Sequence, residues 1–119
     1  MSGQPLDHII KKIIDVTETI SSDYQSEAFE IDRTEKGFAC VLRLANGNGS
    51  VNMIFELEVS LNGNTYVPMA DTDILFQDDD GTITYDILDT NMVYARIGVT
   101  VTSGSIELQT IKITGKRRH

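Results

Sequence analysis

Seven aspartates fall within nineteen consecutive positions of this chain, and they are its first candidates for metal chemistry. Carboxylate oxygens are ligands that Ca²⁺ prefers, and the chain offers Asp71, Asp73, Asp78, Asp79, Asp80, Asp86 and Asp89. Asp78, Asp79 and Asp80 are consecutive, so an extended backbone would point them to opposite sides. No Glu stands where an EF-hand loop closes. We therefore expect a solvated turn ahead of Gly81, with a Ca²⁺ site at these three aspartates as the alternative.

Glu56 and Glu58 could in principle supply the acid and base of a glycoside hydrolase. On one strand face, two residues apart, their Cβ atoms would be about 6.5 to 7 Å from each other. Sugar hydrolases present aromatic platforms, however, and this chain has no Trp, four Tyr and four Phe. We therefore expect both glutamates to face solvent, and we expect no catalytic residues and no cofactor.

The remaining reactive side chains point to packing rather than to catalysis. Cys40 is the only cysteine, so no internal disulfide can form, and its apolar surroundings are typical of a small buried hydrophobe. His8 and His119 lie near the two ends of the sequence, so neither is an expected partner for the thiol. Four tyrosines are expected at the edge of the core, with a ligand or protein interface as the alternative: Tyr24, Tyr66, Tyr85 and Tyr94.

Charge is unevenly distributed along the chain. The formal net charge is −8, and the stretch from Glu56 to Glu107 holds ten acidic residues and one basic residue, Arg96. This balance argues against nucleic-acid binding, which requires a basic surface. Lys116, Arg117, Arg118 and His119 form a basic end, expected to be a solvated tail. The alternative is a contact with an acidic partner, such as the aspartates of a neighbouring copy.

The residues over 51–61 predict the strand that must carry both glutamates. Apolar and polar side chains alternate there, with Ile54 as the exception. A period of two indicates an antiparallel strand with one buried face. Asn62 and Gly63 then predict a type I′ hairpin turn, followed by a short strand that Pro68 ends at a sheet edge.

The same periodicity predicts further strands. Alternation predicts strands over 26–32, 83–87 and 93–101, and an apolar run over 38–44 predicts a central strand covered on both faces. The glycine-rich segment 46–50 predicts a hairpin loop between two strands.

Irregular segments complete the pattern. Within 69–81 we expect three apolar residues to lie beneath the sandwich: Ile74, Leu75 and Phe76. Ser103 and Gly104 predict a turn, and the apolar phase slips at Thr110, which indicates a β-bulge. Seven to eight strands at regular spacing are typical of a single antiparallel β-sandwich, of jelly-roll or discoidin-like type.

The first twenty residues allow two interpretations. Four isoleucines have helical spacing behind a possible N-cap at Asp7: Ile9, Ile10, Ile13 and Ile14. The segment is also rich in β-branched residues, which favour strands. We expect a strand over 13–20, preceded by a short N-terminal arm or helical turn over 1–12.

One domain is expected between two short extensions. The sandwich covers 13–115, between the arm at 1–12 and the basic tail at 116–119. The start of the sequence has no basic segment followed by an apolar one, so no signal peptide is expected. No apolar run approaches the roughly 20 residues of a membrane helix, so no membrane partner is expected.

Several short motifs resemble one protein family. These are the runs Asp23–Phe29, Lys36–Phe38, Phe55–Tyr66 and Val93–Ser105. Together they resemble the small β-sandwich virion proteins of tailed bacteriophages, although Asn62 stands where that family usually has Asp. The resemblance implies a β-sandwich that serves as a capsid decoration or cement protein, or as a head–tail accessory. It implies no enzymatic activity, and it implies a location in the virion, which is assembled in the host cytoplasm.

The implied partners are the major capsid protein or other virion proteins, bound by a dimer or trimer of this chain. Multivalent binding would stabilise the assembled shell. The candidate docking residues are Ile9, Ile10, Ile13, Ile14, Lys116, Arg117 and Arg118. Exposed isoleucines would otherwise be a liability, and the alternative is that they pack on their own sandwich. The alternative function is a carbohydrate-binding module of a tail or fibre, which would use loop tyrosines and Ca²⁺.

Overall fold

The computed structural model describes residues 6–31, 37–88 and 90–118, and the side chains of 12–115 within those ranges. The described residues form strands and no helix: β1 (Leu6–Ile20), β2 (Tyr24–Gln25), β3 (Phe29–Glu30), β4 (Gly37–Ser60), β5 (Val67–Pro68), β6 (Ile74–Phe76), β7 (Gly81–Ile87) and β8 (Tyr94–Arg118). The all-β prediction is confirmed. Accordingly, the described part of the chain contains no helix with the length and apolar character needed to cross a membrane.

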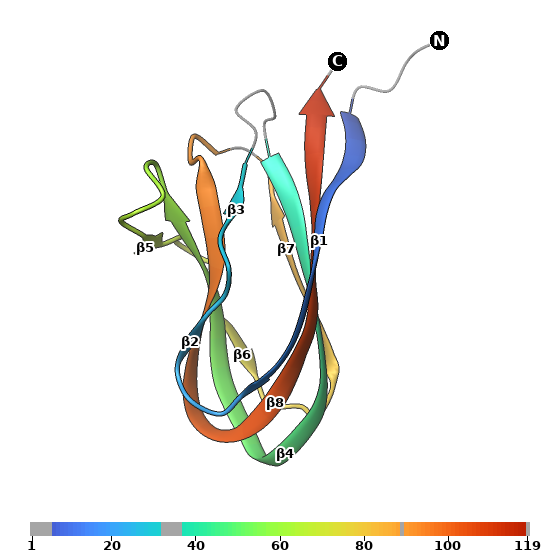
Figure 1. Cartoon of the computed structure of the whole chain (residues 1–119), viewed down its shortest axis with the longest axis vertical. Coiled ribbons are helices and arrows are strands. Elements are labelled where there is room, and N and C mark those ends of the chain that lie inside the picture. The colour runs from blue at the N-terminus through green and yellow to red at the C-terminus, as the bar shows by residue number, and fades with distance from the viewer. Residues whose placement is uncertain (1–5, 32–36, 89, 119) are drawn as a thin grey trace.

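Two long strands, β4 and β8, contribute to both layers of a sandwich (Figure 1). They pair antiparallel from Gly37 opposite Lys116 to Ser60 opposite Tyr94, and both bend midway. The first layer holds the N-terminal half of β4, the C-terminal half of β8, β1 and β7. The second layer holds the other two halves with β2, β3, β5 and β6. The predicted antiparallel β-sandwich is therefore confirmed.

The bends of β4 and β8 lie opposite each other and use residues with positive φ. Asn46 has a φ of 58°, Gly49 of 74° and Gly104 of 76°, and the register between the two strands shifts at this point. Left-handed residues and bulges turn a strand sharply without ending it. A Cβ atom added at Gly104 would lie 2.8 Å from the Ser50 carbonyl oxygen, so this corner requires glycine.

The corner corrects two sequence predictions. The sequence predicts a hairpin loop over 46–50 and a turn at Ser103 and Gly104, but both segments continue a strand. A hairpin would place 38–44 beside 51–61, whereas these two halves of β4 lie in opposite layers and each pairs with β8. A glycine-rich backbone can form either a hairpin loop or a bend within one strand. The bend forms here because both halves of β4 pair with β8, which lies far along the sequence.

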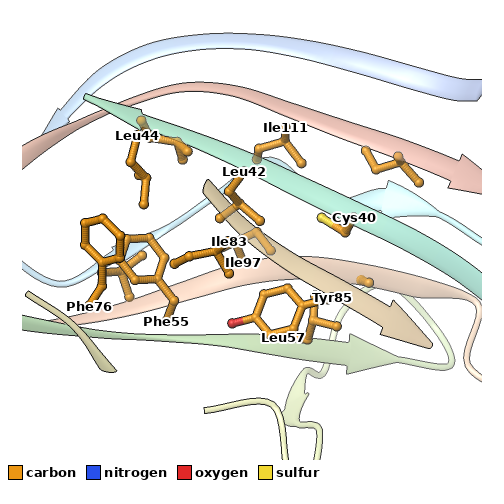
Figure 2. Close-up of a cluster of buried hydrophobic side chains, with 14 of the residues drawn as sticks. Cys40, Leu42, Leu44, Phe55, Leu57, Phe76, Ile83, Tyr85, Ile97 and Ile111 are labelled. Atoms are coloured by element: carbon orange, nitrogen blue, oxygen red, sulfur yellow. The ribbon is translucent and has the colours of Figure 1, made fainter. Parts of the chain in front are cut away.

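Side chains that alternate inward from both layers form one core, part of which is shown in Figure 2. In the strand predicted over 51–61, the alternating apolar side chains up to Val59 are buried, and Ile54 points outward with 39% of its surface exposed. Phe55 packs edge-on against Phe76 with ring centroids 6.0 Å apart, a geometry that aromatic rings favour. The prediction of one buried face is therefore confirmed for this strand.

The predicted change of phase at Thr110 is a bulge in β8. Thr110 pairs with Arg43, and Leu108 pairs with the next residue of β4, so Gln109 is the extra residue. Leu108 and Ile111 are both buried, although one has an even and the other an odd residue number, so regular alternation would place them on opposite faces. The extra residue Gln109 explains this, because each residue after a bulge points to the face opposite the one that regular alternation predicts.

Strand β1 includes residues 6–12, where the sequence favours an arm or a helical turn. Its pairing with β8 skips one residue between Ile10 and Lys12, which is a bulge that shifts the phase of the strand. Ile13 therefore points outward and Ile14 packs against the core. The bulge explains why the four isoleucines have a spacing that imitates a helix.

The basic end also belongs to the sheet. Residues 116–118, expected in a solvated tail, are the last residues of β8, and Lys116 pairs with His8 of β1. The two predicted docking segments, from opposite ends of the sequence, are thus neighbouring strands. His119 of the predicted tail and residues 1–5 of the predicted arm lie outside the described residues.

The connection after β4 is wider than predicted. A type I′ turn needs positive φ at both Asn62 and Gly63, and of these two Gly63 alone has it, at 79°. The Asn62 Oδ1 atom instead accepts hydrogen bonds from the backbone N–H groups of Asn64 at 2.8 Å and Thr65 at 3.0 Å, which closes a longer loop. Strand β5 then pairs at the sheet edge and ends at Pro68, as predicted.

Candidate functional site

The outer surface of the second layer carries the two glutamates that the sequence singles out. Glu56 and Glu58 point outward from β4, because the residues that alternate with them fill the core. Both lie on the solvent side of the strand, as predicted, and both are half-buried. The partial burial has a structural cause, since Asp73 lies against one glutamate and Arg96 against the other. We call the outer surface around Glu56, Glu58 and Asp73 the carboxylate face.

Glu58 is paired with the single basic residue of the acidic stretch. Glu58 and Arg96 are register partners on β4 and β8. The Arg96 Nε donates a hydrogen bond of 2.6 Å to the Glu58 Oε1, and the side chains keep only 24% and 15% of their surface exposed, respectively. The Arg96 Cζ atom also lies 4.1 Å from the ring centroid of Tyr66, within cation–π range. Glu58 is therefore neutralised, and the two glutamates do not form a free acid–base pair.

Glu56 meets a second carboxyl group instead of a base. Partial burial, a hydrogen bond with the Asp73 carboxyl group, and repulsion by Asp73 and Glu58 together raise the pKa of Glu56. Two carboxyl groups in contact favour the state in which one of them keeps a proton. The carboxylate face thus holds a carboxyl pair beside a neutralised ion pair.

The segment between β5 and β6 positions Asp73 beside Glu56. The Met69 N–H donates to the Leu57 carbonyl oxygen at 2.8 Å. The Oγ1 of the buried Thr72 accepts a hydrogen bond from the Leu57 N–H at 3.1 Å and donates one to the Met69 carbonyl oxygen at 2.8 Å. These bonds fix the segment to β4 and place Asp73 at the sheet edge next to Glu56. The sequence alone does not indicate this approach.

A groove of about 370 Å³ runs across the carboxylate face. Its lining residues are Asp23, Tyr24, Gln25, Glu56, Glu58, Val99 and Thr100. Gly98 lies beneath the Glu58 side chain, and a Cβ atom added there would come within 2.5 Å of the Glu58 Oε2. Glycine at this position of β8 thus leaves room for the Glu58 side chain. The oxygen atoms of the groove can accept hydrogen bonds from cationic or hydroxyl groups.

The aspartates considered for Ca²⁺ lie elsewhere and do not converge. Asp78, Asp79 and Asp80 form an exposed turn between β6 and β7, and the Asp79 carbonyl oxygen accepts a 2.8 Å hydrogen bond from the Gly47 N–H. Within 6–31, 37–88 and 90–118, no three carboxylate, imidazole or thiol side chains gather closely enough to hold a metal ion. The solvated turn is the structure found, and Asp89 lies outside the described residues.

The thiol and the tyrosines are mainly structural. Cys40 is fully buried as predicted, and burial raises its thiol pKa to about 12. Tyr85 is also buried, and its hydroxyl group has no hydrogen-bond partner among the described residues. Tyr24 and Tyr94 are half-buried, and one face of the Tyr66 ring is covered by Arg96. The described tyrosines therefore do not form an open aromatic platform.

The structure separates the predicted docking residues by their exposure. Ile13 is 56% exposed on the outer surface of the first layer, whereas Ile14 packs against the core. The backbone of β1 at Ile9 and Ile10 pairs with β8, and the backbone of β8 at 116–118 pairs with β1. The side chains of these residues are outside the part of the chain whose side chains the structure describes. Docking through these residues stays a prediction.

One apolar feature of the carboxylate face was missed by the sequence predictions. Ile74, Leu75 and Phe76 are expected beneath the sandwich, but Leu75 points outward with 59% of its surface exposed. It pairs with Ile54, the residue that breaks the alternation in β4. That break is the signal in the sequence, because an apolar residue at an outward position indicates a contact surface.

The fold and this surface define a β-sandwich protein with an acidic outer face.

No protein-family model matches the sequence, and no curated protein matches it. A solved structure of infectious bursal disease virus, Gt strain, is similar to 92% of this chain at a TM-score of 0.57 and 10% identity. The coat protein of tobacco streak virus is also similar, with a TM-score of 0.50 and 11% identity. That likeness covers 100% of this chain and 90% of the coat protein chain.

A third similar structure is latent PorU from Porphyromonas gingivalis, with a TM-score of 0.54, 10% identity and 94% of this chain covered. The chain spans 13% of PorU and 31% of the bursal disease virus chain. Identities this low establish a shared fold and nothing of the activity. The β-sandwich is thus one that occurs in viral proteins, including a coat protein.

Proposed function

We propose that this chain is a structural protein of a tailed-bacteriophage particle, without enzymatic activity, that decorates the outer surface of the capsid. Six large apolar side chains exposed on the described residues carry this proposal: Ile13, Ile54, Leu61, Val67, Leu75 and Leu88. Leu61 and Val67 line an apolar groove of about 230 Å³ together with Met92. Contiguous apolar surface marks contacts with other proteins, and two such places are the register pair Ile54–Leu75 and the groove at Leu61 and Val67. A shell of many subunits can cover them.

Two further observations support a structural role. The coat protein of tobacco streak virus shares the fold over most of its length, so a single sandwich of this size can serve in a virus shell. The motifs over 55–66 and 93–105 that resemble phage virion proteins form the centre of the second layer and its adjoining loop. The partners would be the major capsid protein and further copies of this chain, in a virion assembled in the host cytoplasm.

The alternative, a carbohydrate-binding module on a tail or fibre, is less well supported by the geometry. It would need open tyrosine faces and clustered aspartates, and the described residues place Tyr85 in the core and leave Asp78, Asp79 and Asp80 unclustered. Binding to a glycan would nevertheless be detectable in the same experiment.

The test uses expanded, DNA-free shells of the phage whose genome carries the gene. Purified protein should sediment with these shells at a saturating ratio and raise the temperature at which they dissociate, because it binds only the assembled state. Unexpanded shells are the control. Protein that ignores the shells contradicts the proposal, and Ca²⁺-dependent binding to a glycan array would establish the alternative.

A further inference from the structure

An asparagine precedes a glycine at three places in this chain, Asn46, Asn48 and Asn62. Such a pair can react with itself. The glycine nitrogen attacks the side-chain amide carbon of the asparagine, since glycine has no side chain that obstructs the approach. Ammonia leaves, and water opens the resulting five-membered ring. The reaction requires an asparagine side chain that can turn and a glycine nitrogen that can face it, and the three pairs differ in both respects.

Asn62 is held within the loop that follows β4. Its Oδ1 atom accepts the hydrogen bonds from the N–H groups of Asn64 and Thr65. The Gly63 N–H, whose nitrogen would have to attack, donates to the Oγ of the buried Ser60 at 2.9 Å. Both reacting groups are therefore engaged, and these bonds must break before the ring can close.

Asn46 is held by two other segments of the chain. Its Nδ2 atom donates a hydrogen bond of 3.2 Å to the Glu107 Oε1 on β8. The Gly47 N–H donates to the Asp79 carbonyl oxygen at 2.8 Å. A Cβ atom added at Gly47 would lie 2.6 Å from the Asp79 Cα, so the backbone is packed against the turn between β6 and β7. The Gly47 nitrogen can attack only if this contact opens.

Asn48 lies at the corner of β4 and has neither constraint. Asn48 and Gly49 are both exposed, and the Asn48 side chain makes no hydrogen bond to another described residue. A Cβ atom added at Gly49 would meet a single neighbour, the Gly104 Cα at 3.4 Å. Between Ala45 and Asn52, a stretch described throughout, β4 pairs with β8 at Asn48 alone, and the register shifts on both sides. Backbone with so few pairing contacts opens at a low free energy.

We propose that Asn48 is a site of spontaneous deamidation, and that the fold protects Asn46 and Asn62. The Gly49 nitrogen loses its proton to solvent and forms a bond to the Asn48 Cγ. The bond between Cγ and Nδ2 then breaks, and ammonia leaves with a proton from water. Water next adds to one of the two carbonyl carbons of the ring, and the bond from that carbon to the Gly49 nitrogen breaks. Addition at Cγ gives aspartate, and addition at the backbone carbonyl carbon gives isoaspartate.

Each conversion replaces a neutral amide with a carboxylate at an exposed position. Molecules of different age therefore differ by one negative charge. The isoaspartate product also has one additional atom in its backbone, at the bend through which β4 passes from one layer to the other (Figure 1). The inference concerns the purified protein and does not depend on its proposed place in a phage particle.

Incubation of the folded protein in mildly alkaline buffer tests the proposal. Tandem mass spectrometry of its peptides locates each exchange of an NH₂ group for OH. Asn48 should convert about ten times as fast as Asn46 or Asn62, because hydrogen bonds must first break at the other two sites. In concentrated urea, which removes the fold, the three sites should convert at similar rates.

Two variants complete the test by anion-exchange chromatography. The more acidic species should accumulate in wild-type protein and be lost in Asn48→Gln, because glutamine forms the corresponding ring far more slowly. Asn91→Gln changes an exposed asparagine that precedes methionine, so it should behave like wild type. Equal rates at the three sites of the folded protein, faster conversion at Asn46 or Asn62, or an Asn48 that stays intact while the unfolded chain reacts would each overturn the inference.

Discussion

Glu58 and Arg96 face each other across neighbouring strands, with the Arg96 Nε only 2.6 Å from the Glu58 Oε1. The pair lies at the centre of the second layer, and the Arg96 guanidinium also stacks on Tyr66, which belongs to the loop between β4 and β5. One cation thus links two strands and a loop. It also cancels the charge of one of the glutamates that the sequence singles out.

Removing Arg96 should therefore destabilise the fold. Arg96→Ala leaves Glu58 mostly buried and without its partner, and we expect a loss of about 1–3 kcal/mol in the free energy of unfolding. Urea denaturation measures this value. Lys12→Ala is the matched control, because the Lys12–Glu27 pair is exposed and 3.6 Å long, which predicts a loss below about 1 kcal/mol. Equal losses for the two variants would contradict the assigned role of Arg96.

Glu56 should make the stability depend on pH. Its pKa is raised in the folded protein, so it favours folding at pH values below its ordinary pKa, and this contribution is lost as the pH rises through the raised value. Glu56→Gln removes the titration. Relative to the variant, wild-type protein should lose stability from about pH 4 upward, and the difference should stay below about 1 kcal/mol.

Chemical denaturation of both proteins at pH 4 and pH 7 tests this expectation. Glu30→Gln is the control, because it removes an exposed carboxyl group of β3 in the other part of the second layer. If Glu56→Gln and Glu30→Gln respond alike to pH, the contact between Glu56 and Asp73 does not influence stability.

The corner of β8 should tolerate no side chain at Gly104. Its φ of 76° and the 2.8 Å approach of Ser50 and Val51 predict that Gly104→Ala costs about 1–3 kcal/mol. Gly49→Ala shares the positive φ but has its nearest neighbour at 3.4 Å, so it should cost only about 1 kcal/mol. Thermal unfolding of both variants gives the comparison, and a larger loss for Gly49→Ala would refute the proposed role of Gly104.

The basic end is expected to contribute to shell binding. Changing Lys116, Arg117 and Arg118 together to Gln removes three charges, each of which contributes about 0.5 kcal/mol if paired at an interface. The affinity for expanded shells should fall about tenfold. Changing Asp78, Asp79 and Asp80 to Asn alters the same number of charges elsewhere and should leave the affinity unchanged. Unaltered binding by the Gln variant would exclude this docking segment.

The strands were predictable because burial on one face leaves a period of two. The alternation over 51–61 and the slip at Thr110 depend only on local sequence, and both predictions are confirmed. The corner at 46–50 was not predictable, since glycine-rich backbone suits a hairpin and a bend equally well. The bulge between Ile10 and Lys12 misled the prediction in another way, because one extra residue converts a strand pattern into helical spacing.

The candidate site was only partly predictable for a related reason. Glu56 and Glu58 follow from strand alternation, but their partners come from distant parts of the chain. Asp73 is brought close by the hydrogen bonds of Thr72, and Arg96 by its register on β8. Sequence spacing does not encode such contacts, because they depend on which strands become neighbours.

Strand β8 has a consequence for the order of folding. It pairs with β1, β2, β3 and β4 and contributes to both layers. Neither layer can therefore close before β8 has docked, and the apolar residues of both halves of β4 stay exposed until then. A substitution that weakens the pairing of β8 should thus loosen both layers at once.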